Sequence, residues 1–193
     1  RPDTLFGVTF MVLAPEHPLV DALIASPPEN CSGKALAAYV TEAKNRADVE
    51  RMADSKEKSG VFSGLFATNP ATGKQIPVWV ADYVLMGYGH GAIMAVPGHD
   101  QRDHDFAIAH DIPLVEVVQQ ADTETVTACF SGKGTAINSS SELCSIDGLQ
   151  TDAAIVTIIA WLEESGAGKA KVNYKLRDWL FSRQRYWGEP FPI

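Results

Sequence analysis

The chain has 193 residues, of which 46% are hydrophobic, and its formal net charge is −8 at pH 7. Its length and apolar content are sufficient to bury a core, and no apolar run approaches the roughly 20 residues that a membrane-spanning helix needs. These properties predict one globular domain and argue against a membrane-bound or secreted protein. The three cysteines, Cys31, Cys129 and Cys144, are far apart and follow no paired spacing, which predicts reduced thiols, a cytoplasmic location and no structural zinc.

The first half of the chain alternates between strand-like and helix-like patterns. Residues 8–13 form an apolar run ended by prolines, which predicts a buried strand, and a short helix is expected over residues 21–24. Residues 26–33 have the composition of a loop. Apolar residues then recur at helical spacing from Leu36 to about Met52, which predicts a long amphipathic helix. Residues 69–77 (NPATGKQIP) are expected to turn between two strands, the second covering 78–85.

The second half continues the same alternation. The glycine-rich segment GYGHGAIMAV predicts a strand at its end, and helix signals return after Pro97. Residues 113–118 (PLVEVV) predict a further strand, and 131–134 (SGKG) a turn. Ile155, Ile158, Ile159 and Leu162 mark one face of a helix that we expect to end at Gly166. Because the strands are short and irregularly connected, the fold class is a mixed α/β (α+β) domain rather than a doubly wound sheet.

Basic residues gather at the end of the chain. Residues 169–193 hold six Lys or Arg and two acidic residues, a local balance of +4 that leaves −12 for the remainder. Aromatic residues are interleaved with these charges, as in segments that contact phosphate groups. An ordinary solvated surface explains the same composition equally well.

The densest polar segment is VPGHDQRDHDFAIAH, residues 96–110. Asp100 is a natural N-cap for a helix, with Asp103 three residues later as in a capping box. Asp103 also shares a helical face with Phe106, which should point inward. Because burying an unpaired charge is costly, an inward carboxylate needs a partner, and the ammonium group of a ligand is a candidate.

Two other interpretations of these segments stay open. A cluster of His and Asp could bind a divalent metal ion, but the spacing lacks H-E-x-x-H, so we expect no metal site. The glycines of GYGHG permit close approach of main chain to a ligand, although a bulge is the commoner reason for glycine in such a place.

Three separated motifs together resemble one known family. They are RPDTLFG at 1–7, YGHGAIMAVPGHDQRDHDFA at 88–107 and LRDWLFSRQRYWGEPFPI at 176–193. They occur in the order seen in the editing insertion of class I aminoacyl-tRNA synthetases, and MAVPGHDQRD is similar to the bacterial leucyl-tRNA synthetase form rather than the isoleucyl or valyl form. The resemblance covers essentially the whole chain. It implies a small barrel-like mixed sheet flanked by helices.

The resemblance also implies a domain organisation. Residues 1–193 would be a single editing domain excised from a larger synthetase, with about 170–193 returning towards the catalytic core. Motifs of the synthetic ATP site, of the H-I-G-H and K-M-S-K-S kind, do not occur in the sequence. The expected partners are the 3′ acceptor end of tRNA(Leu), its noncognate aminoacyl group and the parent catalytic domain. No cofactor is expected for editing, since ATP and Mg²⁺ belong to that other domain.

The implied activity is post-transfer editing. A methylene difference contributes only about 1–3 kcal/mol to discrimination, so isoleucine, valine or norvaline would be attached to tRNA(Leu) too often without a second, hydrolytic sieve. By motif position, Thr4 resembles the block against leucine and Asp103 the anchor of the substrate ammonium. Backbone donors near Arg1 to Thr4 are expected to stabilise the oxyanion while water attacks. His99 and Asp100 could assist, or be structural.

Other positions follow from the same motifs. Met94, Tyr88 and Val96 resemble pocket-lining residues, and Leu85 and Met86 resemble residues whose main chain lies near the terminal adenosine. We expect Lys175, Arg177 and Arg183 to contact tRNA. The sequence departs from the family pattern at His90, where threonine is usual, and at His104, where an aromatic ring is usual. Two alternatives remain: a tRNA-docking module without hydrolysis, and an isoleucyl- or valyl-type editing domain.

Overall fold

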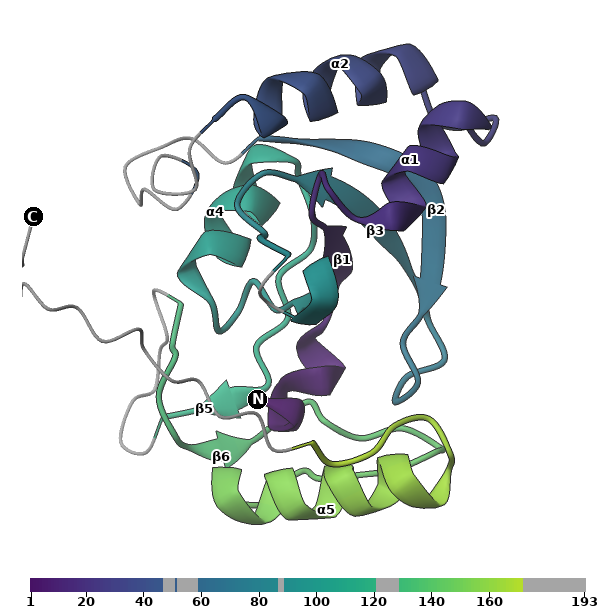
Figure 1. The fold of residues 1–193 in the computed structure, drawn as a ribbon. Coiled ribbons are helices and arrows are strands. Elements are labelled where there is room, and N and C mark those ends of the chain that lie inside the picture. Colours follow the sequence, from purple (N-terminus) through teal and green to yellow (C-terminus); the bar gives the residue numbers. More distant parts are fainter. Residues whose placement is uncertain (47–50, 52–58, 87–88, 121–128, 172–193) are drawn as a thin grey trace, which may run out of the picture.

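The computed structural model describes residues 1–46, 51, 59–86, 89–120 and 129–171. A four-stranded mixed sheet forms its centre, in the order β2-β3-β1-β4 (Figure 1). The strands are β1 (Phe10–Leu13), β2 (Gly60–Thr68), β3 (Gln75–Ala81) and β4 (Ala92–Ala95). β1 pairs parallel with β3 and antiparallel with β4, while β2 and β3 form an antiparallel hairpin. Among the described residues this sheet is open, with β2 and β4 at its edges, so the expected barrel-like closure is absent there.

Helices cover both faces of this sheet. α1 (Pro18–Ala25) and α2 (Gly33–Lys44) pack on one face, and α4 (Gln101–Ala109) on the other (Figure 1). The alternation of β1 explains this arrangement: Phe10 and Val12 join the core under α4, and Leu13 joins the core under α1 and α2. The rings of Phe10 and Phe106 stack with their centroids 5.2 Å apart.

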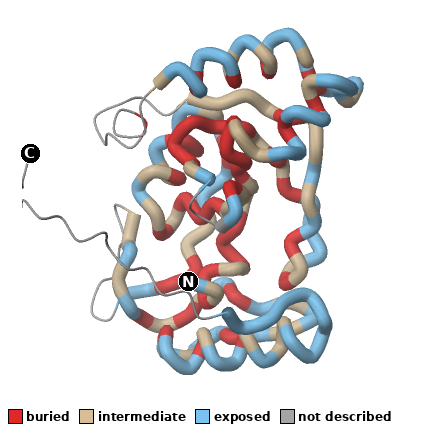
Figure 2. Tube along the Cα trace, viewed as in Figure 1, coloured by how far each residue is buried: buried red, intermediate tan, exposed pale blue. Residues whose placement is uncertain are grey.

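A second hydrophobic core lies beside the sheet. It contains the small sheet of β5 (Val118–Gln119) and β6 (Thr135–Ala136), and one face of α5 (Thr151–Glu164). Phe6, from the 3-10 helix η1 (Pro2–Gly7), completes it, so η1 lies between the two parts of the molecule (Figures 1 and 2). Another 3-10 turn, η2 (Gly89–Gly91), leads into β4.

Most elements agree with the sequence predictions. The strand at 8–13, the turn between β2 and β3, the strand that ends GYGHGAIMAV, the helix after Pro97 and the helix before Gly166 are all present. The first of these strands begins at Phe10, and the strand predicted over 78–85 is displaced to Gln75–Ala81. The helix predicted over 21–24 extends over Pro18–Ala25. Gly166 has a φ of +70°, as expected for a residue just beyond a helix end.

Two other predicted elements are also shorter than the patterns indicate. α2 ends at Lys44 rather than near Met52, and just beyond its end the Arg46 side chain contacts the buried carboxylate of Asp82, 2.6 Å away. The strand predicted over 113–118 is reduced to Val118–Gln119. There the N–H of Val117 donates to a histidine side chain instead of to a neighbouring strand.

No helix in the described ranges is long and apolar enough to cross a membrane. Cys31, Cys129 and Cys144 are all free thiols.

Candidate functional site: a buried aspartate beside a 3-10 helix

A cavity of about 150 Å³ opens where η1, β4 and the start of α4 meet. Its lining consists of seven residues, all of them predicted site residues: Arg1, Thr4, Met94, Val96, His99, Asp100 and Asp103. A cavity of this size has room for one small organic group. The fold thus brings together residues that lie about 100 positions apart in the sequence.

Asp103 is buried, as its helical spacing predicted, with only 4% of its surface exposed. Tyr83 Oη donates a hydrogen bond of 2.9 Å to its Oδ1, and the backbone N–H of Val96 donates one of 2.9 Å to its Oδ2. Burial raises the pKa of the Asp103 carboxyl from 3.8 to about 6, although the Val96 hydrogen bond lowers it. The carboxylate therefore has partners in the protein itself, which the sequence pattern did not reveal.

These two hydrogen bonds leave Asp103 with unused acceptor capacity. An ionised carboxylate accepts about four hydrogen bonds, and within the described part of the chain only two are made. Its location in the cavity lining therefore allows it to accept hydrogen bonds from a bound ammonium group.

Asp100 is the N-cap of α4, as predicted. Its Oδ1 accepts from the backbone N–H groups of Arg102, at 2.9 Å, and Asp103, at 3.3 Å. The other half of the predicted capping box, a bond from the Asp100 N–H to the Asp103 side chain, is wrong. The Asp103 carboxylate accepts from the Val96 N–H instead, and the Asp100 N–H donates to Val96 O. The Asp103 side chain therefore does not cap α4 and instead lines the cavity.

Thr4 is 2% exposed and held in one conformation by its own helix. Its hydroxyl donates to the Arg1 carbonyl oxygen at 2.9 Å, and its backbone N–H donates to the same oxygen at 3.2 Å. Because the hydroxyl is engaged, χ1 is fixed and Thr4 contributes shape to the cavity. The Thr4 N–H is likewise already used, which removes it from the set of expected oxyanion donors.

The Arg1 side chain is held by two separate segments of the chain. Its guanidinium pairs with the buried carboxylate of Asp3 at 2.7 Å and donates to the carbonyl oxygens of Ser131 and Gly132. This arrangement ties the start of η1 to the 131–132 turn. Arg1 therefore contributes to the cavity wall, with most of its donors satisfied within the protein.

His99 is a structural residue in this arrangement. Its Nε2 accepts from the N–H groups of Val117 at 2.9 Å and Val118 at 3.1 Å, so the proton lies on Nδ1, which donates to Phe130 O at 2.7 Å. Burial also lowers the pKa of His99, which favours this neutral form. Because both nitrogens are used, His99 lacks a lone pair with which to act as a general base.

Some predicted residues lie elsewhere. Leu85 and Met86 precede η2 and do not line this cavity. Tyr88 and the three basic residues Lys175, Arg177 and Arg183 lie outside the described residues. His90, with a φ of 59°, is exposed in η2, and His104 lies on α4, also away from the cavity lining.

Tyr83 is the residue that sequence reasoning missed. It follows β3, packs its ring 5.6 Å from that of Phe106, and reaches Asp103 from twenty residues away. No local spacing connects the two positions, although an inward carboxylate does imply a buried donor somewhere.

No group of three or more His, Cys, Asp or Glu that could hold a metal ion occurs among the described residues. The His110 ring lies instead against Trp79 and Phe106, with centroids 4.6 and 4.2 Å away. Burial raises the pKa of the Cys129 thiol to about 11 and also raises that of Cys144, so neither favours the thiolate form.

Comparison with solved structures places the fold among aminoacyl-tRNA synthetases. A crystal structure of the ternary complex of Agrobacterium radiobacter K84 agnB2 LeuRS with tRNA and LeuAMS matches 91% of this chain and 18% of that one, with a TM-score of 0.60 and 30% sequence identity. A leucine–tRNA ligase of Chloroherpeton thalassium is 54% identical over the whole chain. This chain spans about a quarter of the length of that relative, 24%.

The family model described as leucyl-tRNA synthetase, editing domain, matches residues 1–163. The chain belongs to this family of leucyl-tRNA synthetase editing domains. The match includes every residue that lines the cavity and ends before the basic segment at 169–193. The isoleucyl- or valyl-type alternative is not supported by these relationships.

Proposed function

We propose that this chain hydrolyses the ester bond of tRNA(Leu) that carries isoleucine, valine, norvaline or a similar noncognate amino acid, and leaves leucyl-tRNA intact. Water attacks the ester carbonyl carbon, the bond to the ribose oxygen breaks, and the products are the free amino acid and tRNA with a free hydroxyl group. The observation that carries this proposal is the position of Asp103 and Thr4 in the lining of one small cavity.

Asp103 is the proposed anchor for the α-ammonium of the aminoacyl group. It is buried, its two oxygens are oriented by Tyr83 and Val96, and it keeps acceptor capacity for a cation. A charge-assisted hydrogen bond of this kind contributes about 1.5–3 kcal/mol. Anchoring the ammonium fixes where the ester lies, which is the largest requirement when water is the nucleophile.

Thr4 is the proposed block against leucine. Its χ1 is fixed by the bond to Arg1 O, so its methyl group cannot move aside without breaking that contact. Met94 and Val96 supply the apolar remainder of the cavity. A rigid wall of this kind discriminates between substrate side chains by their shape. One methylene group contributes about 1–3 kcal/mol to that discrimination.

Water, rather than a protein group, is the proposed nucleophile. Cys129 and Cys144 have raised pKa values, and both nitrogens of His99 are occupied. The vicinal ribose hydroxyl of the terminal adenosine and main-chain donors near Arg1 are the proposed aids to the attack. We propose no cofactor for this step, a cytoplasmic location, and the parent synthetase and its tRNA as partners.

A deacylation assay tests this function. Isoleucyl-tRNA(Leu) and leucyl-tRNA(Leu) are incubated with an excess of the chain, alone and within its parent enzyme, and release of the labelled amino acid is followed. Release of isoleucine, with leucine retained, is the expected result. The Asp103→Asn variant should lose this release, while Cys129→Ser should keep it.

The same assay decides the second candidate, a docking module without hydrolysis. Retained binding of tRNA together with no release of any amino acid, by wild type in the parent enzyme, would support docking alone and contradict the proposed hydrolysis.

A further inference from the structure

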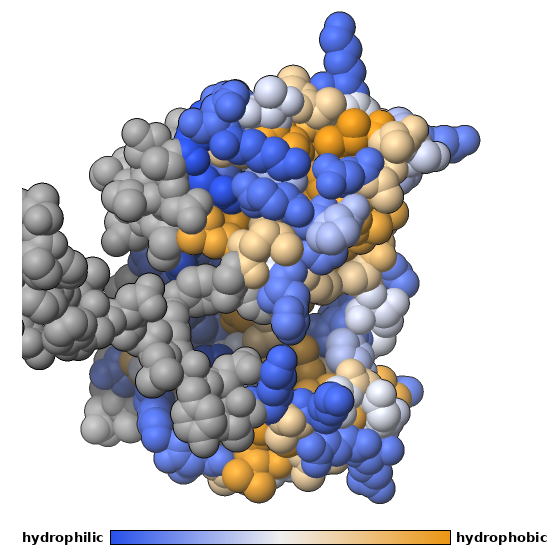
Figure 3. Space-filling view, viewed as in Figure 1, coloured by the Kyte–Doolittle hydropathy of each residue, from blue (hydrophilic) through white to orange (hydrophobic). Residues whose placement is uncertain are grey.

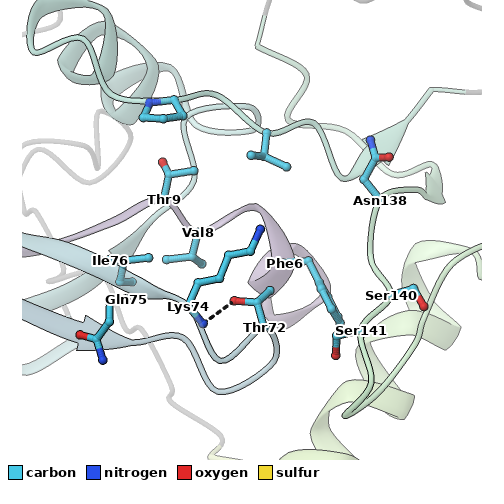
Figure 4. Close-up of a pocket in the computed structure, with 12 residues that line it drawn as sticks. Phe6, Val8, Thr9, Thr72, Lys74, Gln75, Ile76, Asn138, Ser140 and Ser141 are labelled. Carbon is cyan, nitrogen blue, oxygen red and sulfur yellow. Dashed lines mark hydrogen bonds between the residues drawn. The ribbon is translucent and has the colours of Figure 1, made fainter.

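A different cavity, of about 530 Å³, lies elsewhere in the described part of the chain. Its lining comes from four separated segments, at residues 6–9, 72–76, 113–115 and 138–141 (Figure 4). Figure 3 shows the surface hollowed between the part built on the sheet and the part built on α5, with apolar side chains at depth and hydrophilic ones around the rim. Its volume lies in the range of small-molecule sites.

The walls of this cavity are tied to one another. Asn69, at the turn between β2 and β3, donates from Nδ2 to Leu5 O of η1 at 2.9 Å. Ser141 Oγ, on the opposite wall, donates to Ala71 O in the same turn at 2.7 Å. These bonds hold the hairpin turn, η1 and the 138–141 segment in fixed positions, so the cavity is preformed.

The floor of this cavity is apolar, and its hydrogen-bond donors lie at the sides. Phe6, Val8 and Ile76 supply apolar surface, although each is no more than 6% exposed. Lys74 extends from the hairpin turn across the cavity, and its ammonium end points into the open space (Figure 4). Among the described residues this ammonium forms no ion pair, and the cavity lining holds no Asp or Glu.

The cavity lining also holds hydroxyl groups that donate no hydrogen bond within the described part of the chain, among them that of Thr72, which accepts from the Lys74 N–H. Thr9 Oγ1 is shielded from solvent and has no hydrogen-bond partner in the described part of the chain. Ser140 is likewise without a side-chain partner there, whereas the Ser141 hydroxyl is used by Ala71 O. A single ammonium, free hydroxyls and no carboxylate favour a ligand head with one negative charge and several acceptor atoms.

From these features we propose that this cavity binds a small aliphatic carboxylate, with its head group at Lys74 and its apolar body against Phe6, Val8 and Ile76. One cation balances a monoanion, and the net charge of −8 disfavours a dianion such as an alkyl phosphate. The cavity is separate from the one that holds Asp103: the two share no lining residue. The proposal is therefore independent of the proposed deacylation.

Titration of the isotopically labelled chain with sodium hexanoate, followed by amide chemical shifts, tests the proposal. Saturable shift changes are expected at residues 72–76 and 138–141. Acetate lacks the apolar body and hexan-1-ol lacks the charge, so each should bind at least roughly tenfold more weakly. Shift changes that do not saturate, or that arise elsewhere, would overturn the proposal, and tighter binding of hexyl phosphate would overturn the choice of a carboxylate.

Variants separate the assigned head-group contacts from general attraction to positive charge. Lys74→Gln should raise the dissociation constant for hexanoate by roughly tenfold. The matched control is Lys34→Gln, which removes an exposed charge on α2 and should change nothing. Equal effects of Lys74→Gln and Lys34→Gln would contradict the assigned head-group site. Because the readout is binding, the outcome does not depend on any hydrolytic activity.

Discussion

The phenol of Tyr83 donates a buried hydrogen bond of 2.9 Å to Asp103 Oδ1, joining the segment after β3 to the inner face of α4. This contact fixes one oxygen of the carboxylate and stabilises its charged form against the effect of burial. The proposed anchor of the substrate therefore depends on a residue that lies outside all three sequence motifs.

Tyr83→Phe removes this donor and keeps the ring. The pKa of Asp103 should then rise above about 6, because the charged carboxylate loses a hydrogen bond. We expect the acid limb of the deacylation pH profile to move to higher pH, with activity recovering once the pH exceeds the raised pKa of Asp103. Tyr39→Phe is the matched control, since it removes a hydroxyl that donates to Ser59 O, accepts from the Asp82 N–H and does not line the cavity. An unchanged profile for Tyr83→Phe would show that the phenol does not tune Asp103.

Asp103→Asn should change stability as well as activity. Since the pKa of Asp103 is 3.8 when unfolded and about 6 when folded, ionisation opposes folding, by about 3 kcal/mol above pH 6. This penalty disappears as the pH falls towards 4, where the carboxyl is protonated in both states. The asparagine variant should therefore be more stable than wild type at pH 7, and the difference should shrink at acidic pH.

Denaturant unfolding of both proteins at pH 4, 5, 6 and 7 measures this difference. Asparagine can still accept from the Val96 N–H and can donate to Tyr83 Oη, so the local hydrogen bonds persist. A gap in stability that stays constant with pH would contradict the raised pKa.

Thr4→Ala tests the block against leucine. Removing the methyl and hydroxyl groups enlarges a cavity of about 150 Å³, so the variant within its parent enzyme should release leucine from leucyl-tRNA(Leu) while still clearing isoleucyl-tRNA(Leu). Thr4→Val is the control, because it keeps the shape and loses only the hydroxyl; it should still exclude leucine. If Thr4→Ala loses isoleucine release and gains no leucine release, Thr4 belongs to the hydrolytic apparatus instead.

The basic residues at the end of the chain are expected to contact tRNA. Replacing Lys175, Arg177 and Arg183 together with alanine should weaken tRNA binding without sequence preference, and should reduce the slope of log affinity against log salt. Filter binding at several salt concentrations measures both quantities. An unchanged affinity and slope would assign these residues to a contact with the rest of the synthetase.

Features that depend on neighbouring residues could be predicted from the amino-acid sequence alone. The spacing of Asp100, Asp103 and Phe106 predicted a capped helix with an inward carboxylate, because helical periodicity acts over one or two turns. The motifs at 1–7 and 88–107 identified all seven residues that line the smaller cavity.

Other features depend on contacts between distant segments and became visible only in the folded chain. Three sets of contacts join residues that lie 18 to 36 positions apart. They are the hydrogen bond from Tyr83 to Asp103, the hydrogen bonds of His99 with Val117 and Phe130, and the contact of Arg46 with Asp82 beyond the end of α2. Local periodicity contains no information on such pairs, because burial and hydrogen bonding are settled only when separate elements pack together. The same packing decided that the sheet is open across the described residues, and that a second cavity lies between η1 and the hairpin turn.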